Sequence, residues 1–412
     1  MPDTSPSSPD ETPGPHVTVV GIGADGALAA EARRVVEHAG LVLGGRRQLD
    51  LLPDVPGQLR RAWPAPLRAG TADLLAQHGG LPVVALASGD PLLSGIATTL
   101  VDLLGAERVD VLPAVSSVAL ARAAMRWPAE SHAVVSVVGR DVALVRRELA
   151  PGRRILVLSS DEHTPGRLVD VLVEAGYGSS TVTVLGDLGT DRSRVHRLGP
   201  AASVREQELA VSRLNVVALE CAGPHLGGWT PGLPDTAFEH DGQLTKRDLR
   251  AAALARLAPV PGEHLWDVGA GAGSVGIEWM RAHATCTATA IEGDAQRAER
   301  IGRNASRLGV PGLQVVVGRA PQALAGLRAP DAVFVGGGAT VDGVLDACLA
   351  ALRPGGRLVV HGVTLETEQL LGRCHAEHGG ELTRTSIETA APIGSFTGWT
   401  PARAVTQWAL TR

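Results

Sequence analysis

Residues 222–234 interrupt the chain with the sequence AGPHLGGWTPGLP, which holds three prolines, four glycines and no hydrophobic period. Proline and glycine end helices and strands alike, so a run this rich in both predicts a linker between separately folded parts. The length of 412 residues fits two domains of ordinary size. We therefore expect one domain over residues 16–222, a linker over 223–238 and a second domain over 239–412. Residues 1–15 are rich in serine, proline and acidic side chains and are expected to form a disordered leader.

The first half alternates short apolar runs with segments of helical spacing. Such alternation predicts an α/β fold whose sheets are mostly parallel and covered by helices. The expected helices cover residues 27–38, 116–126 and 165–175. The expected strands cover residues 17–20, 82–87, 109–112, 133–138, 154–158, 181–185 and 214–220.

The second half restarts the alternation with a helix over residues 245–257, for which Thr245 is the expected N-cap. Five strands follow, each with a helix expected after it, and the tail is expected to form two strands with no helix between them. A parallel sheet finished by an antiparallel pair resembles the Rossmann-like class I methyltransferase fold. The five strands are expected at residues 264–268, 286–291, 314–317, 332–335 and 357–361, and the tail strands at 382–389 and 404–411.

The strongest chemical motif is LWDVGAGAGS at residues 265–274, where a strand runs into a glycine loop and then a helix. Glycine lets the backbone approach a ligand closely and adopt a positive φ. The loop glycines are Gly269, Gly271 and Gly273. Glu292 follows the next strand, and a carboxylate at such a tip can accept both hydroxyls of a ribose. The pattern predicts a nucleoside-containing cofactor.

The glycine spacing separates two possible cofactors. A dinucleotide site needs Gly-x-Gly-x-x-Gly, because a pyrophosphate lies on the helix N-terminus. Here Ser274 occupies the third glycine position of that pattern, and the loop reads Gly-x-Gly-x-Gly. S-adenosylmethionine has no pyrophosphate, and the nearby Asp267 suits its positive sulfonium and amino groups. The motif favours S-adenosylmethionine over a nicotinamide cofactor. A glycine turn that binds nothing is disfavoured, because its entropic cost would go uncompensated.

Four motifs of the second half together resemble the decarboxylating precorrin-6B methylase family, over residues 240–412. They are Thr245-Lys246-Arg247, the loop 269–274, Glu292-Gly293-Asp294 and Gly336-Gly337-Gly338. The resemblance implies that Gly336 and Gly337 border the substrate. It also implies that S-adenosylmethionine contacts Thr245, Gly269, Ala270, Gly271, Ala272, Gly273, Glu292 and Ala320.

Four blocks of the first half resemble the tetrapyrrole methylase family, over residues 17–221. They are Gly21-Ile22-Gly23-Ala24-Asp25-Gly26, Gly44-Gly45-Arg46-Arg47, Ala87-Ser88-Gly89-Asp90-Pro91 and Leu112-Pro113-Ala114-Val115-Ser116-Ser117. The resemblance implies the two-lobed class III methyltransferase fold, with Gly21 and Gly23 shaping a substrate trough. It also implies a second S-adenosylmethionine site lined by Gly89, Asp90, Ser94, Gly95, Ser116 and Ser117.

Two positions depart from the tetrapyrrole methylase pattern. Ala114 stands where many relatives have glycine, and Val138 replaces a common histidine, so no acid or base role is assigned there. A substrate fringed with carboxylates needs cationic partners, because guanidinium groups match carboxylates bidentately. Arg46, Arg47 and Arg140 are the candidates, and solvated surface arginines are the alternative interpretation.

The composition disfavours several classes of function. A net charge of −5 and an aromatic content of 3% argue against nucleic-acid binding, which favours basic surfaces and exposed rings. No apolar run reaches the roughly 18–20 residues that span a bilayer, so no membrane partner is expected. The four cysteines form no Cys-x-x-Cys pair, which is typical of reduced thiols in a cytoplasmic protein.

Two clusters of polar residues invite interpretations that we reject. Cys374 and His378 share a helix face, but the neighbouring His375 and Glu377 point elsewhere, so no metal site is expected. Residues 159–163 read SSDEH and bring serine, aspartate and histidine together in sequence. A catalytic triad is assembled in space and not along the chain, so a polar loop is expected there.

The fusion of the two families implies an enzyme that methylates a precorrin at carbons 5 and 15 and decarboxylates the ring-C acetate, within cobalamin synthesis. The methyl donor is already activated and the nucleophile is an electron-rich ring carbon, so alignment is the main task and no catalytic residue is assigned. The expected partner is a tetrapyrrole, and a homo-oligomer is expected. The alternatives are an RNA or protein methyltransferase, a nicotinamide-dependent oxidoreductase, and a non-catalytic tetrapyrrole-binding scaffold.

Overall fold

The computed structural model describes residues 15–78, 80–205, 207, 210–225 and 227–412, so residues 1–14 of the expected leader lie outside it. Contacts between residues divide the chain into two compact units. The first unit holds the residues up to Gly139 together with Arg154–Asp170 and Ser180–Glu220. The second unit holds Arg140–Arg153, Val171–Ser179 and Cys221–Arg412.

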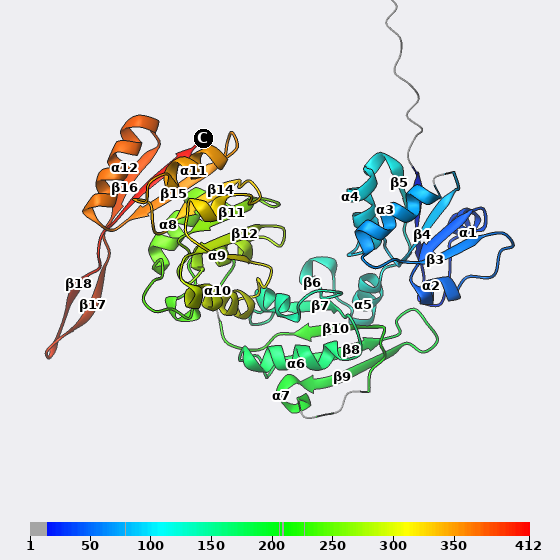
Figure 1. The fold of residues 1–412 in the computed structure, drawn as a ribbon. Helices are drawn as coiled ribbons and strands as arrows, with labels where there is room; N and C mark the ends of the chain where they lie inside the picture. Colours follow the sequence, from blue (N-terminus) through cyan, green and yellow to red (C-terminus); the bar gives the residue numbers. More distant parts are fainter. Residues whose placement is uncertain (1–14, 79, 206, 208–209, 226) are drawn as a thin grey trace, which may run out of the picture. The chain divides into compact units, whose positions relative to one another are not determined.

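The first sheet of the first unit is parallel throughout, with the order β3-β2-β4-β1-β5 (Figure 1). Its central strands are buried because runs of valine and leucine face helices on both sides. The strands are β1 (Val17–Ile22), β2 (Leu41–Gly44), β3 (Leu59–Ala62), β4 (Val83–Ser88) and β5 (Val109–Leu112). The helices are α1 (Ala30–Glu37), α2 (Arg46–Asp50), α3 (Leu67–Gln77) and α4 (Ile96–Leu104).

The second sheet has the order β6-β7-β10-β8-β9, and only its β6–β7 pair is parallel. The loop from β8 to β9 is too short for a parallel crossover, which needs a dozen or more residues. Helix α5 (Ser117–Met125) packs on β7 and β10 through Val118 and Ala121. The strands are β6 (Ala133–Ser136), β7 (Arg154–Leu158), β8 (Thr181–Gly186), β9 (Arg194–Pro200) and β10 (Asn215–Glu220). The further helices are α6 (Thr164–Glu174) and α7 (Ala201–Val204).

The second unit contains a seven-stranded sheet with the order β13-β12-β11-β14-β15-β19-β16. Its first five strands are parallel, and β19 runs antiparallel to both β15 and β16, as the sequence predicted. The strands are β11 (His264–Val268), β12 (Thr287–Glu292), β13 (Gln314–Val317), β14 (Ala332–Val335), β15 (Arg357–Gly362), β16 (Glu381–Thr385) and β19 (Val405–Thr411).

Helices bury both faces of this sheet in two apolar cores, one around Trp279 and Phe334 and the other around Trp408. The prediction of a helix after every parallel strand is wrong after β13, where only a 3-10 turn at Gln322–Leu324 forms. Pro321 and Gly326 flank this turn and leave no room for a longer helix. The helices are α8 (Arg247–Leu257), α9 (Ser274–Ala282), α10 (Ala295–Arg307), α11 (Val344–Ala351) and α12 (Leu365–His378).

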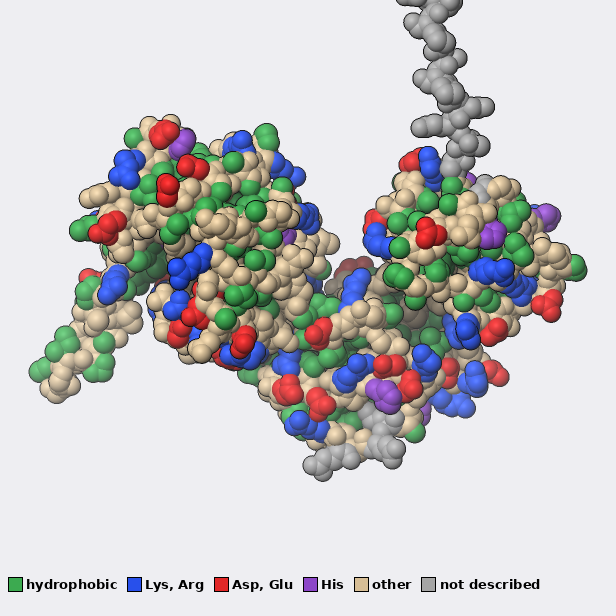
Figure 2. All heavy atoms as spheres, viewed as in Figure 1, with side chains coloured by type: hydrophobic (Ala, Val, Ile, Leu, Met, Phe, Trp, Pro, Cys, Tyr) green, Lys and Arg blue, Asp and Glu red, His purple; other side chains and the backbone are tan. Residues whose placement is uncertain are grey.

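A two-stranded hairpin, β17 (Glu388–Ile393) and β18 (Phe396–Pro401), interrupts the tail between β16 and β19. The expected tail strand over residues 382–389 is therefore two separate strands. The hairpin extends away from the seven-stranded sheet, and several of its apolar side chains are exposed to solvent (Figures 1 and 2). Phe396 is 80% exposed and Trp399 is 69% exposed.

No helix among the described residues is both long enough and apolar enough to cross a bilayer. Cys221, Cys286 and Cys348 are buried free thiols.

Candidate functional site

A cavity of about 1030 Å³ lies at the carboxyl ends of the parallel strands of the second unit. Ligands of open α/β sheets bind at this edge, because the loops there diverge. The cavity is bordered by the residues that follow β11, β12, β13 and β14, and by His361 near the end of β15. Eight residues predicted from the sequence line it: Thr245, Gly269, Ala270, Gly271, Glu292, Ala320, Gly336 and Gly337.

The three loop glycines all have a positive φ, between +60° and +74°. A Cβ atom on Gly269 would lie 2.7 Å from the carbonyl oxygen of Gly337, and one on Gly271 would lie 2.7 Å from that of Gln243. These two glycines therefore let the walls of the cavity approach each other. Gly273 is the N-cap residue of α9 and packs on Ile301, and Ala272 is fully buried, so both lie behind the cavity wall.

Glu292 is held at the end of β12 by two backbone amides. Its Oε2 accepts a hydrogen bond from the amide of Gly271 at 2.8 Å, and its Oε1 accepts one from the amide of Asp294 at 3.0 Å. The residue is 6% exposed and lines the cavity. Each carboxylate oxygen can accept more than one hydrogen bond, so Glu292 keeps the capacity to receive ribose hydroxyls.

Asp267 is not among the residues that line the cavity, so the interpretation that it balances a positive ligand stays a prediction. It is 1% exposed, and its Oδ2 accepts a hydrogen bond from the amide of Gly276 at 2.9 Å. Its Oδ1 has no hydrogen-bond partner among the described residues. Burial raises the pKa of Asp267 to about 7 from an ordinary value of 3.8. The side chain therefore anchors the start of α9. Its burial costs more free energy when the carboxyl group is ionised than when it is neutral.

We expect Asp267 to make the protein less stable as pH rises. Because its folded pKa exceeds the unfolded value, the folded state binds the extra proton between pH 4 and 7, and the unfolding free energy falls with pH there by up to about 1.4 kcal/mol per unit. Asp267→Asn stays neutral at every pH. Denaturant unfolding at pH 5 and pH 8 should show a smaller loss in the variant than in the wild type. Equal losses in both proteins would contradict this assignment.

A buried ion pair that sequence reasoning missed fixes one wall of the cavity. Arg250 on α8 is fully buried, and its Nε donates to Oε1 of Glu278 at 2.5 Å. Glu278 also accepts the backbone amides of Gly232 at 2.6 Å and Leu233 at 3.0 Å. Arginine and glutamate are ordinary on helix surfaces, so nothing in the local sequence marks this pair as buried.

Arg250 also determines what Thr245 does. The guanidinium group donates to the backbone oxygens of Thr245 and Leu233. The N-cap residue of α8 is Lys246, and no side chain caps the helix, so the prediction that Thr245 is the N-cap is wrong. Arg250 fixes the backbone of the preceding segment through its carbonyl oxygens, but a guanidinium group only donates and so does not cap the amides of the first helical turn. The segment from Asp235 to Thr245 is thereby held where it lines the cavity.

A second cavity, of about 360 Å³, lies within the first unit. Of the residues predicted for the second cofactor site, Gly89, Ser94, Gly95 and Ser117 line this cavity. Arg47, a predicted substrate contact, borders it as well. Arg47 donates to the backbone oxygen of Ala24 at 3.2 Å and to Oγ of Ser88 at 3.1 Å. The second sheet contributes an apolar side to this cavity, formed by Leu158, Leu185, Leu188 and Val216.

Gly21 and Gly89 permit a close backbone contact beside this cavity. A Cβ atom on Gly21 would lie 2.1 Å from the carbonyl oxygen of Gly89, and one on Gly89 would lie 2.8 Å from Cα of Ser116. Real Cβ atoms do not approach other atoms this closely, so glycine is required at both positions. Gly21 is not among the residues that line the cavity. It shapes the site indirectly, because its close contact positions Gly89, which does line it.

Five other residues predicted for this site stand outside the cavity lining. Ser116 caps α5, since its Oγ accepts the amide of Ala119 at 3.0 Å. Asp90 accepts the amide of Leu92 at 2.9 Å. Gly23 lies in a turn against Asp25, and Arg46 and Arg140 are exposed. Their roles toward a ligand stay predictions.

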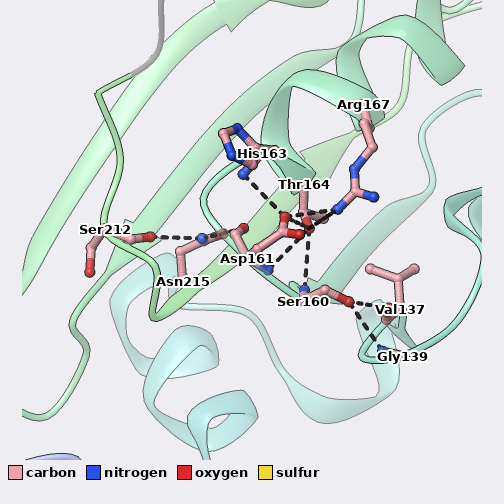
Figure 3. A network of polar contacts seen from close by, with 9 residues as sticks. All are labelled: Val137, Gly139, Ser160, Asp161, His163, Thr164, Arg167, Ser212 and Asn215. Carbon is pink, nitrogen blue, oxygen red and sulfur yellow. Dashed lines mark hydrogen bonds and ion pairs between the residues drawn. The ribbon is translucent and has the colours of Figure 1, made fainter.

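The Ser159–His163 loop forms a polar network that supports α6 (Figure 3). Asp161 accepts hydrogen bonds from Thr164 Oγ1 at 2.9 Å and from Arg167, and the backbone amide of His163 donates to it at 3.1 Å. The hydrogen bond from Thr164 and the charge of Arg167 lower the pKa of Asp161. The only contact of His163 in this network is through its backbone, so the loop is helix-capping structure and no triad.

Two unrelated α/β folds, each with a glycine-built cavity at its strand ends, define the chain as a tandem methyltransferase. Residues 236–412 match the family described as the precorrin methyltransferase domain. Residues 16–202 match the family described as tetrapyrrole (corrin/porphyrin) methylases. Both resemblances inferred from the sequence motifs are confirmed.

Relatives match the chain from end to end. A protein of a Sinorhizobium species named precorrin-6Y C(5,15)-methyltransferase (decarboxylating) is 46% identical and covers 100% of both chains. A protein of Mycobacterium tuberculosis with the same name is 42% identical over 96% of this chain and all of its own. This chain belongs to the family of precorrin-6Y C(5,15)-methyltransferases (decarboxylating). A Salmonella typhimurium protein named cobalt-precorrin-6B C(15)-methyltransferase (decarboxylating) is 32% identical over 37% of this chain and 80% of its own.

Proposed function

We propose that the protein methylates precorrin-6Y at carbons 5 and 15 and decarboxylates the ring-C acetate, as a step of cobalamin synthesis. The observation that carries this proposal is the 46% identity over the whole chain with a protein named for both methylations and the decarboxylation. The presence of two separate cavities in one chain supports it, because two methylations at distant carbons suit two sites.

The proposed methyl donor in both cavities is S-adenosylmethionine, which supplies a methyl group already activated by its sulfonium. In the second unit the residues that would hold it are Gly269, Gly271, Glu292 and Ala320. The open hydrogen-bonding capacity of the buried Glu292 and the close glycine turns fit a nucleoside. In the first unit Gly89, Gly95 and Ser117 would hold the donor, against an apolar side that excludes water.

We propose that the first domain methylates carbon 5 and that the second methylates carbon 15 and decarboxylates. The Salmonella relative supports a division of the two methylations, because its name joins carbon-15 methylation with decarboxylation alone and its match spans only 37% of this chain. Both reactions of the second domain would then use one cavity. Decarboxylation can use the conjugated ring as an electron sink once the carboxylate leaves water.

Cationic side chains in the large cavity suit an acid-fringed macrocycle. Arg247, Arg319 and Arg403 line the cavity wall and are exposed. Guanidinium groups bind carboxylates bidentately and keep their charge at any physiological pH. We propose that they hold the peripheral carboxylates that are not lost in the reaction. Arg47 is the corresponding candidate in the first domain.

The alternative of an RNA or protein methyltransferase has less support. A nucleic acid needs a basic surface, whereas this chain has a net charge of −5. Incubation with precorrin-6Y and S-adenosylmethionine, followed by mass spectrometry, tests the proposal. The expected product has gained two methyl groups and lost one carbon dioxide. Transfer of methyl groups to RNA or protein, with the precorrin unchanged, would favour the alternative.

A further inference from the structure

A histidine lines the large cavity in a position that nothing in the sequence motifs singled out. His361 lies near the end of β15, is 9% exposed and borders the cavity. Its partner across the antiparallel β15–β19 pair is Gln407, and Nε2 of His361 lies 2.9 Å from Oε1 of Gln407. The edge of the ring also meets Phe334, with centroids 5.0 Å apart and planes at 83°. The imidazole is therefore fixed on two sides.

This arrangement selects one tautomer of the imidazole. The Oε1 atom of Gln407 only accepts hydrogen bonds, so Nε2 of His361 carries the proton of the neutral ring. The other nitrogen, Nδ1, then holds the lone pair and is the atom that can take up a further proton. A residue that can bind and release one proton at one defined atom is suited to proton transfer.

Burial lowers the pKa of His361, and the hydrogen bond with Gln407 partly opposes this effect. No charged neighbour contributes to the shift. The helices packed against β15 are α8 and α12. Their charged residues are Arg247, Asp248, Arg250 and Arg256 of α8 and Glu366, Glu368, Arg373 and Glu377 of α12, and α12 also carries His375 and His378. The adjoining strands β14 and β19 carry no charged residue. The ring is therefore neutral near pH 7 and able to accept a proton.

The other ionisable groups of the cavity are less suited to this role. Asp235 lies 3.6 Å from Lys246 in an ion pair, and Glu292 is held by two backbone amides. Asp248 also lines the cavity but is exposed to water at the start of α8. The remaining cations are arginines, which do not give up a proton in proteins. Among the residues that line the cavity, His361 is the only histidine and no cysteine accompanies it.

We propose that His361 is the proton-transfer residue of the second domain, which carries a proton from the macrocycle to the carbon that carbon dioxide leaves. The inference rests on the proposed function of that cavity. An acetate that loses carbon dioxide needs a proton to become a methyl group, and alignment of the substrate alone does not supply that proton.

The bond between the methylene carbon and the carboxylate carbon breaks, carbon dioxide leaves, and the electron pair enters the macrocycle. There it neutralises the positive charge that the ring gains on methylation. The macrocycle releases one proton to Nδ1 of His361, and the resulting imidazolium gives the same proton to the methylene carbon. His361 ends neutral, and no proton is gained or lost overall.

His361→Gln in the full-length protein tests the proposal. We expect carbon dioxide release to fall by at least about 100-fold, the usual scale for a lost acid–base group. Carbon-5 methylation and S-adenosylmethionine binding by calorimetry should stay within twofold of wild type, which shows that the chain is folded. The matched control is His283→Gln, at an exposed histidine just after α9. Release of carbon dioxide by His361→Gln at the wild-type rate would overturn the proposal.

Gln407→Leu separates proton transfer from a structural role. Loss of the Gln407 amide removes the hydrogen bond that raises the pKa of His361, so the pKa of His361 should fall further. Activity needs the neutral ring, and the acid limb of the pH–rate profile should therefore move to lower pH. A limb that stays in place would contradict the role of His361. Nitrogen NMR of the ligand-free protein should show the neutral Nε2–H tautomer at pH 7, and the opposite tautomer would also contradict it. A wild-type protein that binds S-adenosylmethionine but leaves precorrin-6Y unchanged would overturn the proposed function itself.

Discussion

Gly269→Val should abolish carbon-15 methylation and carbon dioxide release while leaving carbon-5 methylation intact. The new Cβ atom would lie 2.7 Å from the carbonyl oxygen of Gly337, and valine does not tolerate the φ of +67° at this position. The loop must move, and the walls of the cavity with it. A displacement of about 1 Å at a reaction centre costs on the order of 100-fold in rate.

The other domain supplies the internal control for this variant. Mass spectrometry should find a product with one added methyl group and its carboxylates intact. Gly302→Val is the matched substitution, because Gly302 lies on α10 and a Cβ atom added there would have nothing within 4 Å. That protein should give the wild-type product. Loss of both methylations in Gly269→Val alone would show that the two cavities do not work independently.

Arg250→Met should destabilise the second unit more than any change on its surface. It leaves the carboxylate of Glu278 buried without its cation, and it removes the donors to the backbone oxygens of Thr245 and Leu233. Removal of one partner of a buried ion pair costs about 3–5 kcal/mol. Denaturant unfolding, followed by the fluorescence of the tryptophans, measures the loss.

Arg303→Met is the control for this prediction. Arg303 pairs with Glu239 at 3.0 Å, but the two side chains are 54% and 41% exposed. An exposed pair contributes about 1 kcal/mol or less, so this variant should unfold close to wild type. Pairing Arg250→Met with Glu278→Leu should not restore stability, because the amides of Gly232 and Leu233 also need the carboxylate. Full recovery in the double variant would contradict the role given to these backbone contacts.

Many strands could be predicted from the sequence because their apolar runs are bounded by turn residues, although β2 (LVLG) was missed while buried throughout. Residues 109–112, 154–158, 264–268 and 332–335 form strands with the predicted limits. Strand β3 was missed because its sequence, LRRA, is largely exposed at a sheet edge. The hairpin of β17 and β18 was missed because Pro392, Gly394 and Gly398 give that segment the composition of a loop.

The site could be predicted as far as its motifs are local in sequence. Gly269 and Gly271 lie in one loop, and Glu292 ends the next strand, so each could be placed from its own strand-and-loop motif, and they come together in the cavity. His361 and Gln407 are 46 residues apart and meet only because β19 pairs antiparallel with β15. The same holds for Arg250 and Glu278 on neighbouring helices. Contacts of this kind depend on the order in which the strands pair and the helices pack. The spacing of residues within a short segment does not predict that order.

The central claim is that the chain holds two independent sites for the same methyl donor. Titration calorimetry of the full-length protein with S-adenosylmethionine tests it most directly. We expect two molecules bound per wild-type chain and one per Gly269→Val chain. A stoichiometry of one for the wild type, or displacement of the ligand by NADH, would contradict the account.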